Sequence, residues 1–108
     1  MANELMLIQA VSNVGQAVTS LATSVKTFGA IRKQDAVVLE ERLIYLKRAC
    51  RAKGYGMLTR QSVDEITETC QRIKQKNLSG PSLNMAMKLL SLQYQALYEN
   101  IQAYSQNN

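Results

Sequence analysis

The sequence predicts an all-α fold, an antiparallel four-helix arrangement with long N- and C-terminal helices. Apolar residues recur at steps of three and four along most of the chain, and no segment shows the strict alternation of a strand. Glycine and proline fall between the periodic segments, and the connections are short, which favours antiparallel neighbours. We expect a single helical domain, 1–108, with helices at about 3–28, 36–53, 63–76 and 82–105.

The first predicted helix has apolar residues in steps of four and three, the spacing of a coiled-coil seam. This seam consists of Leu7, Val11, Val14, Val18, Leu21, Val25 and Phe28. Gly29 is expected to end the helix. Continuing the seam would place Arg32 and Asp35 in the core, so we expect a turn between Gly29 and Asp35. One kinked helix through residues 29–35 is the alternative.

The two middle helices are shorter and carry one apolar stripe each. Asp35 is the expected N-cap of the second helix, and Ser62 with Glu65 fits a capping box at the start of the third. Residues 54–56 are expected to form the turn between them. The stripes consist of Ala36, Leu39, Leu43, Leu46 and Cys50, and of Val63, Ile66, Cys70 and Ile73. Both cysteines lie on stripes and have no metal-ligand spacing, which predicts buried, reduced thiols.

The fourth helix is apolar on two sides. Its seam consists of Leu83, Met87, Leu90, Tyr94, Leu97, Ile101 and Tyr104. Nearly opposite lie Met85, Leu89, Leu92, Ala96 and Ala103, broken only by Lys88 and Glu99. A helix that is apolar on two sides is usually buried on both, and a chain of this size has little left to cover the second side. The sequence therefore predicts a partner-binding surface. The alternative is a rotated seam, with one wide stripe packed internally.

Charge is distributed unevenly. The chain has 13 basic and 8 acidic residues, a net charge of +5, and all but Glu4, Lys88 and Glu99 lie between residues 26 and 76. On the first predicted helix, the face opposite the seam carries small, uncharged polar residues: Gln9, Ser12, Gln16 and Thr23. Such residues let another chain approach without stripping water from a charge, which predicts a second part of the partner surface. An ordinary neutral polar surface is the alternative.

A basic segment at residues 42–60 is the candidate nucleic-acid site, because phosphate contacts need Lys and Arg and aromatic rings stack on bases. Its candidate residues are Lys47, Arg48, Arg51, Lys53 and Arg60, with Tyr45 and Tyr55 interleaved. The helix dipole offers a simpler explanation, since acids open and bases close both middle helices. An anionic lipid surface is a further alternative.

Several classes of chemistry are disfavoured. The chain has no histidine, no glycine-rich phosphate loop and no nucleophile motif, so we expect no enzyme, no metal and no cofactor. No apolar run is long enough to span a membrane. We read no Sec signal, because Glu4 stands where a basic residue belongs. A cytoplasmic location is therefore expected, with signal-less export by a dedicated secretion system as an alternative.

The sequence thus favours a non-enzymatic helical assembly or adaptor protein. We expect it to self-associate as a homo-oligomer, or to dock another helical protein, through its terminal helices. A small nucleic-acid-binding or regulatory protein using residues 42–60 is the first alternative. A small inhibitor or immunity-type helical module is the second.

Overall fold

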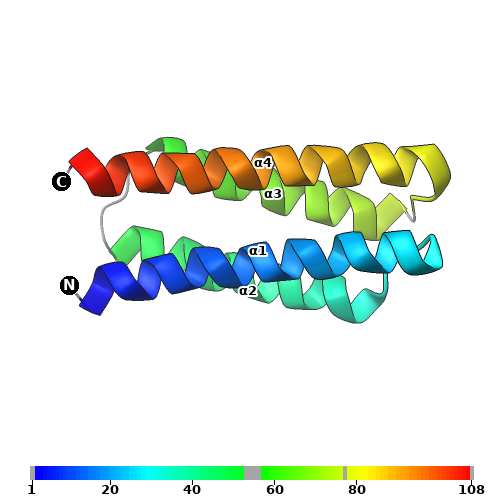
Figure 1. Cartoon of the computed structure of the whole chain (residues 1–108), viewed down its shortest axis with the longest axis horizontal. Coiled ribbons are helices and arrows are strands. Elements are labelled where there is room, and N and C mark those ends of the chain that lie inside the picture. The colour runs from blue at the N-terminus through cyan, green and yellow to red at the C-terminus, as the bar shows by residue number, and fades with distance from the viewer. Residues whose placement is uncertain (1, 53–56, 77, 108) are drawn as a thin grey trace.

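The computed structural model describes residues 2–52, 57–76 and 78–107, and over these residues it contains helices and no strands. The helices are α1 (Ala2–Phe28), α2 (Lys33–Ala52), α3 (Met57–Lys76) and α4 (Gly80–Asn107). They run alternately in opposite directions, so the two chain ends lie at the same end of the bundle (Figure 1). The predicted all-α antiparallel four-helix fold is confirmed. The turn expected at 54–56 lies outside the described residues.

The helices stand at the corners of a square. α1 packs against α2 and α4, and α3 packs against the same two helices. The molecule measures 43 × 20 × 19 Å, which is the length of one long helix by the width of two. α1 and α4 have 27 and 28 residues against 20 each for α2 and α3, so the prediction of long terminal helices is confirmed.

One stripe of each helix fills the shared core. The buried side chains include Leu7, Val11, Val14, Val18 and Leu21 of α1, Ala36, Leu39, Leu43, Leu46 and Cys50 of α2, Val63, Ile66, Cys70 and Ile73 of α3, and Leu83, Met87, Leu90, Leu97 and Ile101 of α4. All of them belong to the predicted stripes, of which Val25 and Tyr94 are only partly buried and the side chain of Tyr104 lies outside the described residues. The fully buried Leu90 and Leu97 fix the rotation of α4. Met85 and Leu92 are 72% and 68% exposed, so a rotated seam with internal packing is excluded.

α3 begins about two turns earlier than predicted. It starts at Met57, which makes Ser62 its sixth residue, so the capping box of Ser62 and Glu65 was wrong. Thr59 and Ser62 are buried and extend the α3 stripe toward its N-terminus. The Ser62 hydroxyl accepts a hydrogen bond from Asn100 Nδ2 of α4 at 2.9 Å. Because Asn100 satisfies the Ser62 hydroxyl inside the bundle, the α3 stripe continues through Ser62, which was predicted to lie at a helix end.

The turn between α1 and α2 lies within the predicted range 29–35 but is shorter, because α2 begins at Lys33 and not at residue 36. Gly29 has a φ of +69°, and its N–H donates to the Val25 carbonyl at 2.9 Å. This is the usual way in which a glycine in the left-handed conformation ends an α-helix. Phe28 was expected in the seam but is 64% exposed, with the Arg32 guanidinium 5.6 Å from its ring centroid. Ser24 is the last buried residue of α1 and lies one turn before Phe28, so the core ends before the helix does.

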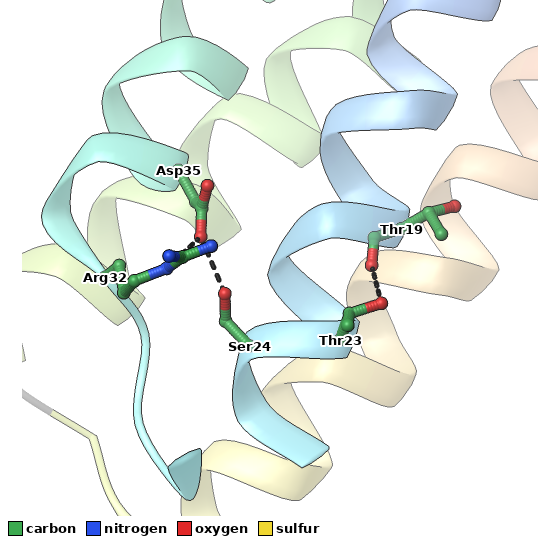
Figure 2. A network of polar contacts seen from close by, with 5 residues as sticks. All are labelled: Thr19, Thr23, Ser24, Arg32 and Asp35. Carbon is green, nitrogen blue, oxygen red and sulfur yellow. Dashed lines mark hydrogen bonds and ion pairs between the residues drawn. The ribbon is translucent and has the colours of Figure 1, made fainter. Parts of the chain in front are cut away.

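Asp35 ties the two helices together at this corner. It lies in the first turn of α2, which starts at Lys33, so its prediction as the N-cap was wrong. Its Oδ2 accepts hydrogen bonds from the Ser24 hydroxyl of α1 at 2.6 Å and from Arg32 Nε at 3.3 Å (Figure 2). Ser24 is buried, so this pairing satisfies a hydroxyl that would otherwise be desolvated without a partner.

α1 and α4 approach each other closely at Gly15. A Cβ at this position would overlap the Tyr94 hydroxyl and lie 2.7 Å from Tyr94 Cζ. The Tyr94 hydroxyl donates to the Val11 carbonyl at 3.2 Å. Gly15 therefore makes room for a tyrosine that links the two terminal helices.

Gly15→Ala tests this contact. Alanine favours a helix interior over glycine by about 1 kcal/mol, so with free space the substitution would stabilise the fold. We expect no stabilisation in the wild-type chain and a gain of about 1 kcal/mol in a Tyr94→Ala background. Urea unfolding of the four proteins of this double-mutant cycle measures the difference. An equal gain in both backgrounds would contradict the contact.

Candidate interaction surface

Charge separates the bundle into two halves. Among the described residues, ion pairs join Lys47 to Asp64 at 2.8 Å, Lys74 to Glu40 at 3.5 Å, Arg72 to Glu68 at 4.0 Å and Arg32 to Asp35 at 3.3 Å. The first two cross from α2 to α3, and none involves α1 or α4. The terminal helices together carry only Glu4, Lys26, Lys88 and Glu99. The α1 and α4 side of the bundle is therefore nearly uncharged.

The outer face of α4 presents a row of apolar side chains to solvent. Met85 and Leu92 are the most exposed, Leu89 is 39% exposed, and Ala96 is also exposed. Their steps of four, three and four repeat the spacing of the buried seam on the opposite side of the helix. We call Met85, Leu89, Leu92 and Ala96 the α4 outer stripe.

The α4 outer stripe turns toward α3 along one edge. Gln93 Oε1 accepts a hydrogen bond from the Thr69 hydroxyl of α3 at 2.7 Å, and Asn100 also bonds to α3. Leu89 and Ala96 lie four residues before Gln93 and Asn100, so helix geometry places them on the same flank. Met85 and Leu92 lie nearer the middle of the outer face.

The predicted partner residues of α1 all face solvent. They are Gln9, Ser12, Gln16 and Thr23. The Thr23 hydroxyl donates to the Thr19 carbonyl and the Thr19 hydroxyl to the Gly15 carbonyl, each at 3.0 Å, and Figure 2 shows the first of these. Because these hydroxyl protons are already used within the helix, covering them would cost little desolvation energy.

An open surface hollow of about 640 Å³ lies along α1 beside its contact with α4 at Tyr94. It is lined by Ser12, Gly15, Gln16, Thr19, Ser20 and Tyr94. Burial raises the pKa of the Tyr94 hydroxyl, with a smaller effect from Tyr98, so this group stays neutral in the physiological range. Of the predicted α1 residues, Ser12 and Gln16 line this hollow and Gln9 and Thr23 do not, whereas the α4 outer stripe turns away from it. The structure thus places the two predicted sets on neighbouring helices without merging them into one patch.

The predicted basic residues are only partly brought together. Lys47, Arg51 and Arg60 line a hollow of about 410 Å³ between the end of α2 and the start of α3, together with Gln61 and Asp64. Arg48 is exposed but does not line this hollow, and Lys53 lies outside the described residues. The dipole explanation holds for α2, with Asp35 in its first turn and Arg51 in its last. It was wrong for the start of α3, whose first turn has no acidic residue.

Two features of α2 were missed by sequence reasoning. Val37, Val38, Ile44 and Tyr45 are exposed apolar side chains, between 37% and 54% exposed. Val37 and Ile44 are seven residues apart, a spacing that places both on the same face of the helix. Charged residues on that face masked the apolar pattern in the sequence. Arg42 was counted with the basic segment, yet its Nη1 donates to the Asn13 carbonyl of α1 at 2.7 Å. Arg42 therefore links two helices.

Both cysteines lie in the core of the bundle. Cys50 and Cys70 are buried, free thiols, as predicted. Burial raises the pKa of each to about 11, with a further increase at Cys70 from Glu40. Over the described part of the chain, no group of three or more Cys, Asp or Glu side chains could hold a metal ion.

No family model matches the chain, and neither the curated proteins nor the solved structures gave a match. None of the helices in the described ranges is both long and apolar enough to cross a membrane.

The thiols give a prediction about reactivity and pH. An ordinary thiol has a pKa of about 8.5, so a pKa of about 11 leaves little thiolate at pH 8. We expect both thiols to react with a disulfide reagent at least about 100-fold faster in denaturant than in buffer. Because the folded pKa is raised, stability should be full below pH 8.5 and fall as pH rises toward 11. Fast reaction of the native protein would contradict this burial.

Proposed function

We propose that the chain is a non-enzymatic helical assembly or adaptor protein that self-associates or docks a helical partner through its terminal helices. The observation that carries this proposal is the α4 outer stripe. α4 buries one seam in the core and leaves a second row of apolar side chains in water, with Leu92 at 68% exposure. Contiguous exposed apolar surface of this kind typically marks an interaction site.

The spacing of the α4 outer stripe favours a helix as the partner. Rows that repeat in steps of four and three fit the holes of a facing helix in knobs-into-holes packing. The neutral side chains of α1 support a role beside it, because Gln9, Ser12, Gln16 and Thr23 offer no formal charge to desolvate. The charged side chains of α2 and α3 keep the opposite half of the bundle in water.

Leu92→Glu tests the proposal directly. Placing a carboxylate in the centre of the α4 outer stripe should weaken association at least about 10-fold, because the charge must be desolvated in the interface. Ile44→Glu is the matched control, since Ile44 is also an exposed apolar residue, at 54%, but lies on α2. Analytical ultracentrifugation and copurification measure association, and circular dichroism checks that both variants stay helical. Equal effects of both substitutions, or no association of the wild-type chain, would contradict the proposal.

Nucleic-acid binding is the second candidate. The observation that favours it is the convergence of Lys47, Arg51 and Arg60 around one hollow. Against it stands Asp64, which pairs with Lys47 at 2.8 Å and reduces the local positive charge.

Fluorescence anisotropy with short RNA and DNA, at low and high salt, tests the second candidate. If this cluster binds phosphates, affinity should fall steeply with salt, and Arg51→Gln with Arg60→Gln should reduce both the affinity and the salt dependence. Lys76→Gln, at the end of α3, serves as the control. Absence of salt-dependent binding at about 50 mM salt would remove this candidate.

A further inference from the structure

We infer that the α4 outer stripe pairs with the same stripe of a second copy of this chain, with the two α4 helices antiparallel and centred near Gln93 and Tyr94. This inference rests on the proposed function and names its partner. Three observations support it: the positions of the two charges on α4, the order of large and small side chains along the stripe, and the absence of a cover for this stripe within the described chain.

Lys88 and Glu99 are the only charged residues of α4, and both are exposed. Neither has an oppositely charged partner among the described residues. They are 11 residues apart, which is three helical turns plus about 20°, so they lie on the same side of the helix. Their midpoint falls between Gln93 and Tyr94.

This placement distinguishes the two possible directions of pairing. In a two-fold antiparallel pair, each flank of one helix meets the same flank of its partner, at mirrored heights. Lys88 of each copy then lies beside Glu99 of the other, so the dimer contains two such ion pairs and all four charges are compensated. In a parallel two-fold pair, the flank that carries Lys88 and Glu99 would meet the opposite flank of the partner helix, which has no charge to compensate either residue. The charges therefore favour the antiparallel direction.

The apolar side chains fit the same register. With the helices centred near Tyr94, Leu92 of one copy faces Ala96 of the other, and Met85 faces Ala103, which is also exposed. A large residue thus meets a small one at each end of the interface, which is the complementarity that close helix packing requires.

The outer face of α2 is a weaker candidate for pairing. Its exposed Val37 and Ile44 are separated by Glu41 and followed by Arg48 and Arg51, so charged residues interrupt the row. Burying that face would require the desolvation of several charges. One helix pair lies at the small end of specific interfaces, so we expect dissociation of the α4 dimer in the micromolar range.

Charge reversal tests the antiparallel pairing. Lys88→Glu and Glu99→Lys should each weaken self-association about 5- to 10-fold, because each places two like-charged contacts in the dimer. The double variant, Lys88→Glu with Glu99→Lys, restores both pairs and should return to within about threefold of the wild type. Arg48→Glu on α2 is the matched control and should have no effect. Sedimentation across about 1–500 µM measures the dissociation constants, and circular dichroism checks folding.

A zero-length crosslink tests the geometry in the unmodified chain. Within one molecule Lys88 and Glu99 are about 16 Å apart along the helix, too far for a carbodiimide-induced amide bond. We therefore expect a Lys88–Glu99 crosslink in the covalent dimer, identified by mass spectrometry, and none in the monomer.

The outcomes separate this inference from the proposed function. The antiparallel α4 pair would be overturned if neither single charge reversal weakens self-association. It would also be overturned if the double variant fails to restore self-association. A chain that stays monomeric at all concentrations, yet needs Leu92 to bind a different helical protein, would also overturn the pair while supporting the proposed function. If the chain is monomeric and Leu92→Glu weakens no binding, both the antiparallel α4 pair and the proposed function are overturned.

Discussion

Each helix buries one apolar stripe in a shared core, and this burial sets the rotation of every helix about its own axis. The stripes repeat in steps of three and four, so each helix can turn only one face inward. In α4 this face is fixed by Leu83, Leu90 and Leu97, all at most 1% exposed. Their burial forces Met85 and Leu92 outward, because those side chains lie on the opposite side of the same helix. The exposure of the α4 outer stripe therefore follows from the way α4 packs in the core.

The polar contacts follow the same division of the bundle. α2 and α3 are joined by the ion pairs Lys47–Asp64 and Lys74–Glu40, both solvent-accessible and each a small contribution to stability. α1 and α4 meet instead through Gly15 and the half-buried Tyr94. Among the described residues, no ion pair involves α1 or α4, which supports the proposal of a partner surface on this side of the bundle.

Sequence periodicity was sufficient for the fold class and for the core stripes, because an apolar residue at a seam position has few alternatives to burial. It failed where polar residues take part in packing. Ser62 resembles a cap in sequence but bonds to Asn100 inside the bundle, and that tertiary contact is not encoded locally. Phe28 matched the seam but lies beyond the end of the core. For the candidate surface, the exposure of Leu92 followed from the helical wheel, whereas the turning of Leu89 and Ala96 toward α3 required the arrangement of neighbouring helices.

We propose that the outer side of α4 is covered by a partner helix in solution. Amide-resolved nuclear magnetic resonance during dilution of the wild-type protein measures this residue by residue. We expect chemical-shift changes that concentrate at residues 85–103 as the protein concentration falls, with α2 unchanged. Spectra that superimpose at every concentration, or changes centred on Ile44 of α2, would contradict it.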